Sequence, residues 1–284
     1  MRKKKEADLL LSPFITYILF LLFYLLYIFV FKIRNKTIII GKENLPKRSH
    51  GVFTFSNHDT FIDSLPIRGS MLNYFDIIFR QNLVPYDTPE FLNFYKTWFG
   101  AFLITHLRNI PIIRKVKRSI KKESKLIKFF KKIPVVRGII LKNIVKKSYK
   151  VEQSIDYLEE KNKFVLKCCE VLKKNNLNIF FGGGRDDEDG SINQCTSGTA
   201  EIILKSIQEN VGVIFQPIFI NGMKKIMPRS IGQKYWKIKC NNTVTIIIGK
   251  PIKFDDLVVL EATDERKIHL IKIRVRESVI NLQP

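Results

Sequence analysis

The segment GVFTFSNHDTFID, residues 51–63, contains the pattern from which the fold is predicted. Its first part, Gly51–Phe55, is an apolar run that predicts a buried strand, and the polar residues after it are expected to open a helix. Further strand candidates alternate with helical patterns along the rest of the chain, which predicts an α/β domain with a central mixed, largely parallel sheet flanked by helices. The strand candidates are Thr37–Ile40, Ile110–Ile113, Leu177–Phe181, Val211–Ile220 and Thr243–Ile248, and the helical patterns are Val151–Lys174, Ser197–Asn210 and Asp264–Asn281.

His58, within this segment, is the first candidate for chemistry. An imidazole, whose ordinary pKa is about 6.5, can take a proton from a hydroxyl group near neutral pH when a carboxylate fixes its tautomer. Asp63 lies five residues further on and supplies such a carboxylate if the intervening residues form a tight turn. The spacing alone is a weak signal, and a histidine that caps a helix is the alternative interpretation.

The N-terminal region predicts a membrane anchor. An uncharged run from Leu9 to Phe31 lies between Arg2–Lys5 and the basic residues Lys32, Arg34 and Lys36. As a helix this run would be about 35 Å long, enough to cross a hydrocarbon core. We therefore divide the chain into an anchor, residues 1–36, and a catalytic domain, residues 37–284. Pro13 leaves an interfacial or re-entrant pair of short helices open, and a buried core helix is a further alternative.

The charge of the chain indicates an anionic partner. Lys and Arg number 49 and Asp and Glu number 26 in 284 residues, for a net charge of +23. Many of the basic residues fall in 114–150, where apolar residues interleave with them, so this segment is predicted to lie on anionic lipid headgroups. A solvated lysine-rich surface is the alternative. Nucleic acid is not expected as a partner, because a membrane anchor would hold the protein away from it.

The cysteines indicate neither a disulfide scaffold nor a metal site. No C-x-x-C pair occurs among the four, and Cys168 and Cys169 lie on a helical pattern typical of packing residues. We expect no metal and no cofactor. Basic residues flank both ends of the anchor, so the charges do not decide which side of the membrane the catalytic domain faces. The absence of a disulfide pattern favours the cytosolic side of the cell's inner (cytoplasmic) membrane for this domain.

Several segments together resemble the glycerolipid acyltransferase family, whose best-known member is lysophosphatidate (1-acyl-sn-glycerol-3-phosphate) acyltransferase. The resemblance rests first on Gly41–Pro46, the strand Val52–Phe55 and the Asn57-His58-x4-Asp63 motif. In all it covers the chain from about Thr37 to Ile252. Later matches follow in the order that the family has them: Phe99-Gly100, Ile110–Arg114, FFGGGR at 180–185, Thr196–Gly198, Val213–Ile218 and Ile248–Ile252.

The resemblance implies a reaction in which an acyl chain passes from acyl-CoA or acyl carrier protein to the free hydroxyl of a lysophospholipid at the membrane, giving phosphatidic acid from 1-acyl-sn-glycerol 3-phosphate. His58 and Asp63 would be the catalytic residues. The implied substrate-binding residues are Asn57, Arg114, Gly182, Gly183, Gly184 and Arg185. Ile133–Arg137 resembles the arginine motif as well, so Arg137 is an alternative to Arg114.

One position departs from the family pattern. Gly182 stands where the family normally has glutamate, and Phe181 stands where it has proline. The acidic run Asp186–Asp189 could replace the lost carboxylate, although a solvated loop is the favoured interpretation. The departure leaves two alternatives open: glycerol 3-phosphate as the acceptor, or a catalytically weakened lipid-binding relative.

Overall fold

The fold is built on a five-stranded mixed sheet. The computed structural model describes residues 13–46, 50–60, 62–72, 74–80, 83–89, 106–112, 157–187, 191–228 and 238–284. The strands are β1 (Lys36–Ile40), β2 (Val52–Ser56), β3 (Leu177–Phe180), β4 (Ile214–Asn221) and β5 (Thr243–Ile248), in the order β1-β5-β4-β2-β3. Strand β4 runs antiparallel to β5 and every other neighbouring pair is parallel, as the prediction of a mixed, largely parallel sheet required.

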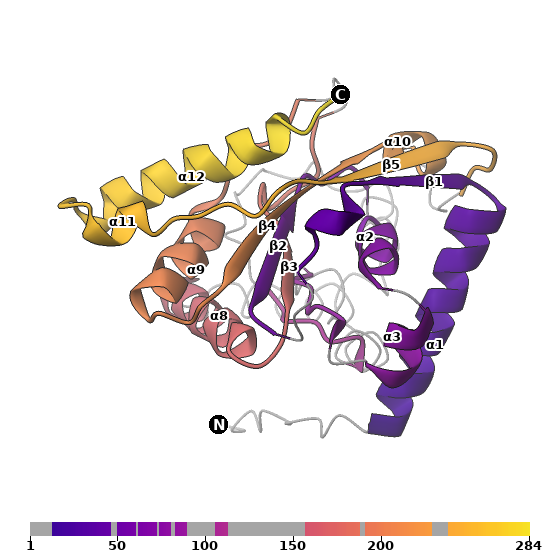
Figure 1. Ribbon diagram of the computed structural model, residues 1–284, viewed down its shortest axis with the longest axis horizontal. Coiled ribbons are helices and arrows are strands. Elements are labelled where there is room, and N and C mark those ends of the chain that lie inside the picture. The colour runs from indigo at the N-terminus through magenta and orange to yellow at the C-terminus, as the bar shows by residue number, and fades with distance from the viewer. Residues whose placement is uncertain are drawn as a thin grey trace, which may run out of the picture.

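Helices cover both faces of this sheet (Figure 1). On one face lie α8 (Tyr157–Leu172), α9 (Ser197–Gln208) and α12 (Asp264–Ile280). On the other lie α1 (Pro13–Tyr27), its π-helical continuation Ile28–Ile33, α2 (Ser64–Met71) and α10 (Met223–Ile226). The shorter elements are α3 (Tyr74–Phe79), α11 (Asp256–Val259) and a 3₁₀ turn at Lys42–Asn44.

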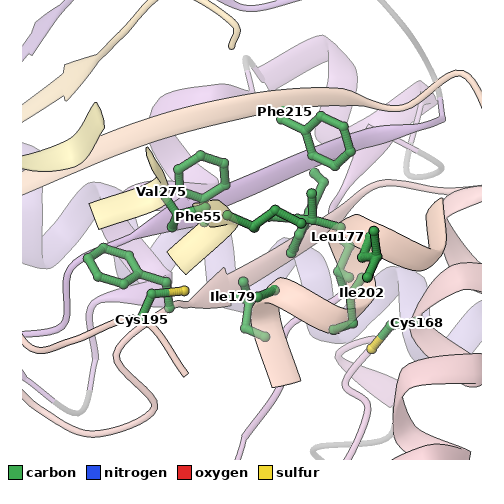
Figure 2. Packing of buried hydrophobic residues seen from close by; sticks show 14 of the residues in the cluster. Phe55, Cys168, Leu177, Ile179, Cys195, Ile202, Phe215 and Val275 are labelled. Atoms are coloured by element: carbon green, nitrogen blue, oxygen red, sulfur yellow. The ribbon is translucent and has the colours of Figure 1, made fainter. Parts of the chain in front are cut away.

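Each face of the sheet has its own core because successive strand side chains point to opposite sides. Phe55, Leu177 and Phe215 pack toward α8, α9 and α12, where Figure 2 shows them against Ile202 and Val275. The alternate residues of β4 and β5 pack toward α1, α2 and α10; they are Ile218, Ile220, Val244, Ile246 and Ile248.

The N-terminal helix is buried on one side only. Phe20, Tyr27 and Phe31 are almost fully buried, and the Tyr27 ring lies so close to Gly69 of α2 that a Cβ there would be 2.5 Å from it. The opposite side carries exposed apolar side chains: Phe14, Ile18, Leu22, Leu25, Leu26, Phe29 and Ile33. Among the described residues, Phe14–Ile33 is the one helical stretch long and apolar enough to cross a membrane.

The prediction of a strand at Ile110–Ile113 is wrong for the residues that the structure describes. Ile110 N donates to Asp87 O at 2.8 Å and Ile112 N donates to Pro89 O at 3.0 Å, so the segment pairs with a loop and not with the sheet. The neighbouring loop residue Tyr86 occupies the free edge of β3, because its N–H donates to Asn176 O and its carbonyl accepts from Asn178 N. The basic segment 114–150, with Arg114 and Arg137, lies outside the described residues.

Candidate active site

Three of the predicted motifs meet at one edge of the sheet: Asn57-His58-x4-Asp63, FFGGGR at 180–185 and Val213–Ile218. Strands β2, β3 and β4 are parallel, and Ser56, the last residue of β2, pairs with Phe180 of β3 and with Ile218 of β4. The segments that follow these strands therefore emerge side by side. In open α/β sheets this carboxyl-terminal edge is where ligands bind.

His58 and Asp63 form a hydrogen-bonded pair in the loop that follows β2. Nδ1 of His58 lies 3.0 Å from Oδ2 of Asp63. The Asp63 carboxylate is fully buried, whereas the His58 side chain keeps 16% of its surface exposed. In the tautomer that donates from Nδ1 to this carboxylate, the lone pair of Nε2 is left for a substrate. Such a ring is ready to accept a proton at Nε2.

The local sequence explains why the Asp63 carboxylate stays in place. Oδ2 also accepts hydrogen bonds from the backbone N–H groups of Asp59 at 2.6 Å and of Thr60 at 2.8 Å, and Oδ1 accepts from the Thr60 hydroxyl. The carboxylate thus closes the turn that it belongs to, just before α2 begins at Ser64. These hydrogen bonds hold the buried side chain in one orientation.

Phe180, at the end of β3, packs flat against the imidazole of His58. Its ring stacks on that of His58, with ring centroids 4.0 Å apart and planes inclined by 16°. The stacked ring shields one face of the imidazole. Sequence reasoning did not single out Phe180, because an aromatic residue in a buried strand is an ordinary packing residue.

Asp186 corrects the interpretation of the acidic run as a solvated loop. Its side chain is buried, Oδ2 accepts from His58 N at 2.9 Å and Oδ1 accepts from Asn193 N at 2.9 Å, while its own N–H donates to the His58 carbonyl. Burial raises its pKa, and the hydrogen bonds from Asn193 and His58 oppose that effect. Asp186 therefore ties the loop after β3 to the histidine loop, whereas Asp187 is exposed.

The glycine run turns tightly beside this clamp. A Cβ on Gly182 would lie 2.6 Å from Cβ of Asn193, so Asn193 fills the space that a side chain at 182 would need. Gly183 has φ +67°, in the region that glycine adopts most easily. Gly184 faces open space, and Arg185 is exposed next to it, with its carbonyl accepting from the Asn193 amide at 3.0 Å.

Asn57 has a structural contact at this edge. Its amide Nδ2 donates to the carbonyl of Ile220 at 2.9 Å and its Oδ1 accepts from Ile220 N at 2.8 Å. Both polar ends of the buried side chain are thus used to join the histidine loop to β4. Arg114 and its alternative Arg137 lie outside the described residues, so their place relative to His58 is not part of this geometry.

A groove opens next to the histidine loop, between the ends of β2 and β4. Its volume is about 440 Å³, and we call it the β2–β4 groove. Asp59 in its wall is buried, and burial, followed by the nearby Asp63 charge, raises the pKa of Asp59 to about 6. Lys224 Nζ lies 3.7 Å from Asp59 Oδ1. The lining residues are Asn57, Asp59, Asp186, Ile192, Phe219, Ile220, Asn221, Gly222, Lys224, Lys225, Gln283 and Pro284.

The cysteines lie away from this chemistry. Cys168 and Cys169 are buried in the core on the α8–α9 side, as expected for packing residues, and Cys195 is buried there as well. Figure 2 shows Cys168 and Cys195. Burial raises the pKa of all three thiols, that of Cys195 to about 12, so they are poor nucleophiles near neutral pH. Within the described ranges, no group of three or more His, Cys, Asp or Glu side chains is arranged to hold a metal ion.

Comparison with known proteins identifies the fold. No protein-family model and no curated protein sequence matches the chain. Among solved structures, it is similar to the crystal structure of the 1-acyl-sn-glycerophosphate (LPA) acyltransferase PlsC from Thermotoga maritima. The TM-score is 0.52 at 15% sequence identity, over 95% of this chain and 81% of that chain. The α/β architecture with its apolar N-terminal helix is thus an acyltransferase-like fold, and the comparison carries the fold alone.

Proposed function

We propose that the protein is a membrane-associated O-acyltransferase that moves a fatty acyl chain from a thioester, acyl-CoA or acyl carrier protein, to the free hydroxyl of a lysophospholipid. The proposed acceptor is 1-acyl-sn-glycerol 3-phosphate and the product is phosphatidic acid. The observation that carries the proposal is the His58–Asp63 pair, 3.0 Å apart, at the carboxyl edge of the sheet in an acyltransferase-like fold.

His58 is the general base in this proposal. Its Nε2 takes the proton of the acceptor hydroxyl while the oxygen attacks the thioester carbonyl. The buried Asp63 carboxylate holds the tautomer and stabilises the imidazolium that forms. The tetrahedral intermediate then collapses to the ester, the C–S bond breaks, and the imidazolium returns the proton to the departing thiolate. No acyl-enzyme is required, because a thiolate is a good leaving group.

The loop after β3 is proposed to hold the phosphate of the acceptor. Backbone N–H groups of a glycine turn can surround an anion, and an arginine side chain offers two parallel donors to phosphate. Gly184 borders open space and Arg185 is exposed beside it, which supports this assignment. Arg114 remains the second arginine proposed from the family resemblance, with Arg137 as its alternative.

The exposed side of α1 is proposed to insert into the lipid. The neighbouring helix α3 adds Phe75 and Phe79, which are 68% and 74% exposed and stack on each other. Since the other side of α1 is packed on α2, one face of the helix is available to lipid while the domain stays attached. We place this domain on the cytosolic side of the inner membrane.

The decisive experiment is acyl transfer by the detergent-purified protein with a labelled long-chain thioester. The acceptors are lysophosphatidate, other lysophospholipids and glycerol 3-phosphate, each tested with His58→Ala and with His269→Ala, an exposed histidine on α12, as the matched control. We expect turnover on lysophosphatidate that falls more than about tenfold in His58→Ala alone. Turnover only on glycerol 3-phosphate would identify that acceptor instead. No His58-dependent turnover on any acceptor by folded protein would contradict an enzymatic function.

Two further measurements test the binding parts of the proposal. Arg185→Ala should raise KM for a phosphorylated acceptor more than KM for the thioester, whereas the exposed Arg266→Ala on α12 should change neither. Leu25→Glu with Leu26→Glu should lower co-flotation with liposomes. Val259→Glu, at a position 82% exposed on α11, is the control that adds a charge elsewhere. Unchanged flotation of the Leu25/Leu26 variant would contradict insertion of α1.

A further inference from the structure

The β2–β4 groove lies at a point where the strand connections diverge. After β2 the chain leads to β3 on one side, and after β4 it leads to β5 on the other, although β2 and β4 are direct neighbours. The loops that follow two such strands separate and leave a crevice outside their carboxyl ends, where ligands of open α/β sheets bind. Asn57 and Asp59 come from the loop after β2, and Phe219, Ile220 and Asn221 come from the end of β4.

The dimensions and lining of the groove suit a small molecule that is partly apolar. Its volume of about 440 Å³ falls within the range of ligand pockets, about 300–1,000 Å³. Ile192, Phe219 and Ile220 give it apolar walls, while the exposed Asn221 contributes an amide. His58 lies in sequence between two lining residues, so a ligand in the groove would sit next to the catalytic loop.

The lysines of α10 supply the charge that a ligand would meet. Lys224 is held at the wall, because its Nζ lies near the Asp59 carboxylate and donates to the carbonyl of Asp187. Lys225 is exposed and makes no ion pair with any residue in the described ranges. The other lining carboxylate, Asp186, is occupied, since each of its oxygens accepts a backbone N–H. Lys224 thus offsets the Asp59 charge, and Lys225 adds to the lining an ammonium group that has no ion-pair partner among the described residues.

Building on the function proposed above, we infer that Lys224 and Lys225 bind the phosphate groups of a phosphorylated substrate in the β2–β4 groove. Ammonium groups bind phosphate as point charges, and the apolar walls suit the uncharged part of the same molecule. Two substrates of the proposed reaction carry such phosphates: the coenzyme A portion of the donor and the headgroup of the acceptor. The lining of the groove includes Asp186 but neither the glycine turn nor Arg185, so the inference gives Lys224 and Lys225 a role in addition to the one proposed for Arg185.

The test measures binding without turnover. Equilibrium dialysis of the full-length protein in detergent gives the affinity for labelled coenzyme A, for pantetheine, which lacks the phosphates, and for labelled lysophosphatidate. The test variant is Lys224→Gln with Lys225→Gln. The matched control is Lys173→Gln with Lys174→Gln, an adjacent and exposed lysine pair between α8 and β3, at the opposite edge of the sheet. Both double variants remove the same two charges, and circular dichroism establishes that each is folded.

We expect the Lys224/Lys225 variant to lose at least about tenfold in affinity for one phosphorylated probe, with the control and pantetheine binding unchanged. Loss confined to coenzyme A assigns the groove to the donor, and loss confined to lysophosphatidate assigns it to the acceptor. Equal losses in the control, unchanged affinities in the test variant, or no binding of either phosphorylated probe by the wild-type protein would overturn the inference. Lysine-dependent binding without His58-dependent turnover would instead keep the groove and refute the proposed catalysis.

Discussion

Asp87→Leu should destabilise the protein strongly, because it leaves a buried arginine without its counter-ion. Nε of Arg68 lies 2.9 Å from Oδ2 of Asp87, and both side chains are buried. The guanidinium also donates to the carbonyls of Leu107 at 3.0 Å and of Arg108 at 3.2 Å. Burial lowers the pKa of Arg68 while the Asp87 charge raises it, so each charge depends on the other.

The magnitude follows from this burial. Removing one partner of a buried ion pair costs about 3–5 kcal/mol, because the remaining charge stays desolvated. For a chain of this length such a loss lowers Tm by on the order of 10 °C. Asn178 of β3, whose amide donates to Asp87 Oδ1 at 2.7 Å, loses its acceptor as well. The Arg68–Asp87 ion pair therefore joins α2, which begins directly after Asp63, to β3 and to residues 107–108.

The assay is thermal and urea unfolding in detergent, followed by circular dichroism. The matched control is Asp256→Leu, which removes the carboxylate of a bidentate ion pair with Arg274. This pair lies at the surface, where the Arg274 side chain is 36% exposed and the Asp256 side chain is 59% exposed. We expect the control to lose less than about 1 kcal/mol. Adding Arg68→Met to Asp87→Leu should restore about 1–3 kcal/mol, since no unpaired charge then remains, although the two carbonyls lose their donor. Equal losses in Asp87→Leu and Asp256→Leu, or a double variant less stable than Asp87→Leu, would refute the reasoning.

Three smaller predictions concern the surroundings of the site. Burial raises the pKa of Asp59 from 3.8 to about 6, so its ionised form opposes folding, and this cost disappears as pH falls through 6. Asp59→Asn should therefore add about 2 kcal/mol to the free energy of unfolding at about pH 7.5 and little near pH 4. A gain in stability that does not depend on pH would contradict this. Gly182→Ala should lower the free energy of unfolding in urea by about 1–3 kcal/mol, because the new Cβ meets that of Asn193. Gly184→Ala, at a position that faces open space, should lower it by less than about 1 kcal/mol, and equal losses would argue against the close contact. Cys168 should resist maleimide in the folded protein and react only after denaturation, which mass spectrometry of the labelled peptide measures; rapid native labelling would mean that the core opens readily.

Features that depend on residues near in sequence could be predicted from the sequence. The strands β1–β5 and the helices α9 and α12 agree with the apolar periodicities to within about three residues, because burial on one face imposes the period of the element. Helix α8 agrees at its C-terminal end, and residues 151–156 of that predicted helix lie outside the described residues. Thr196 and Thr263 begin α9 and α12 as N-caps, accepting from the N–H three residues on. The contact between His58 and Asp63 belongs to the same class, since a turn of five residues suffices to form it.

The segment Ile110–Ile113 shows the limit of local patterns. Its apolar residues have the composition of a strand, and the residues that are described do bond to a neighbour in an extended way. Composition does not identify the partner, however, and here it is the loop at Asp87–Pro89 while Tyr86 takes the free edge of β3. The pairing of a short extended segment depends on which edge is available, and that is decided by the whole fold.

Sequence by itself therefore determined the five strands, the helices α8, α9 and α12 and the apolar N-terminal helix, and it indicated the histidine–aspartate pair, because each rests on contacts within a few residues or on a long apolar run. Only the tertiary structure decided the use of Asp186, the stacking of Phe180 on His58, the buried Arg68–Asp87 pair and the groove between β2 and β4. His58 and Asp186 are separated by 128 residues, and Asn57 and Ile220 by 163. A charged residue in an acidic run is by default solvated, and it becomes a buried clamp only when parallel strands bring a distant loop with free N–H groups to its side.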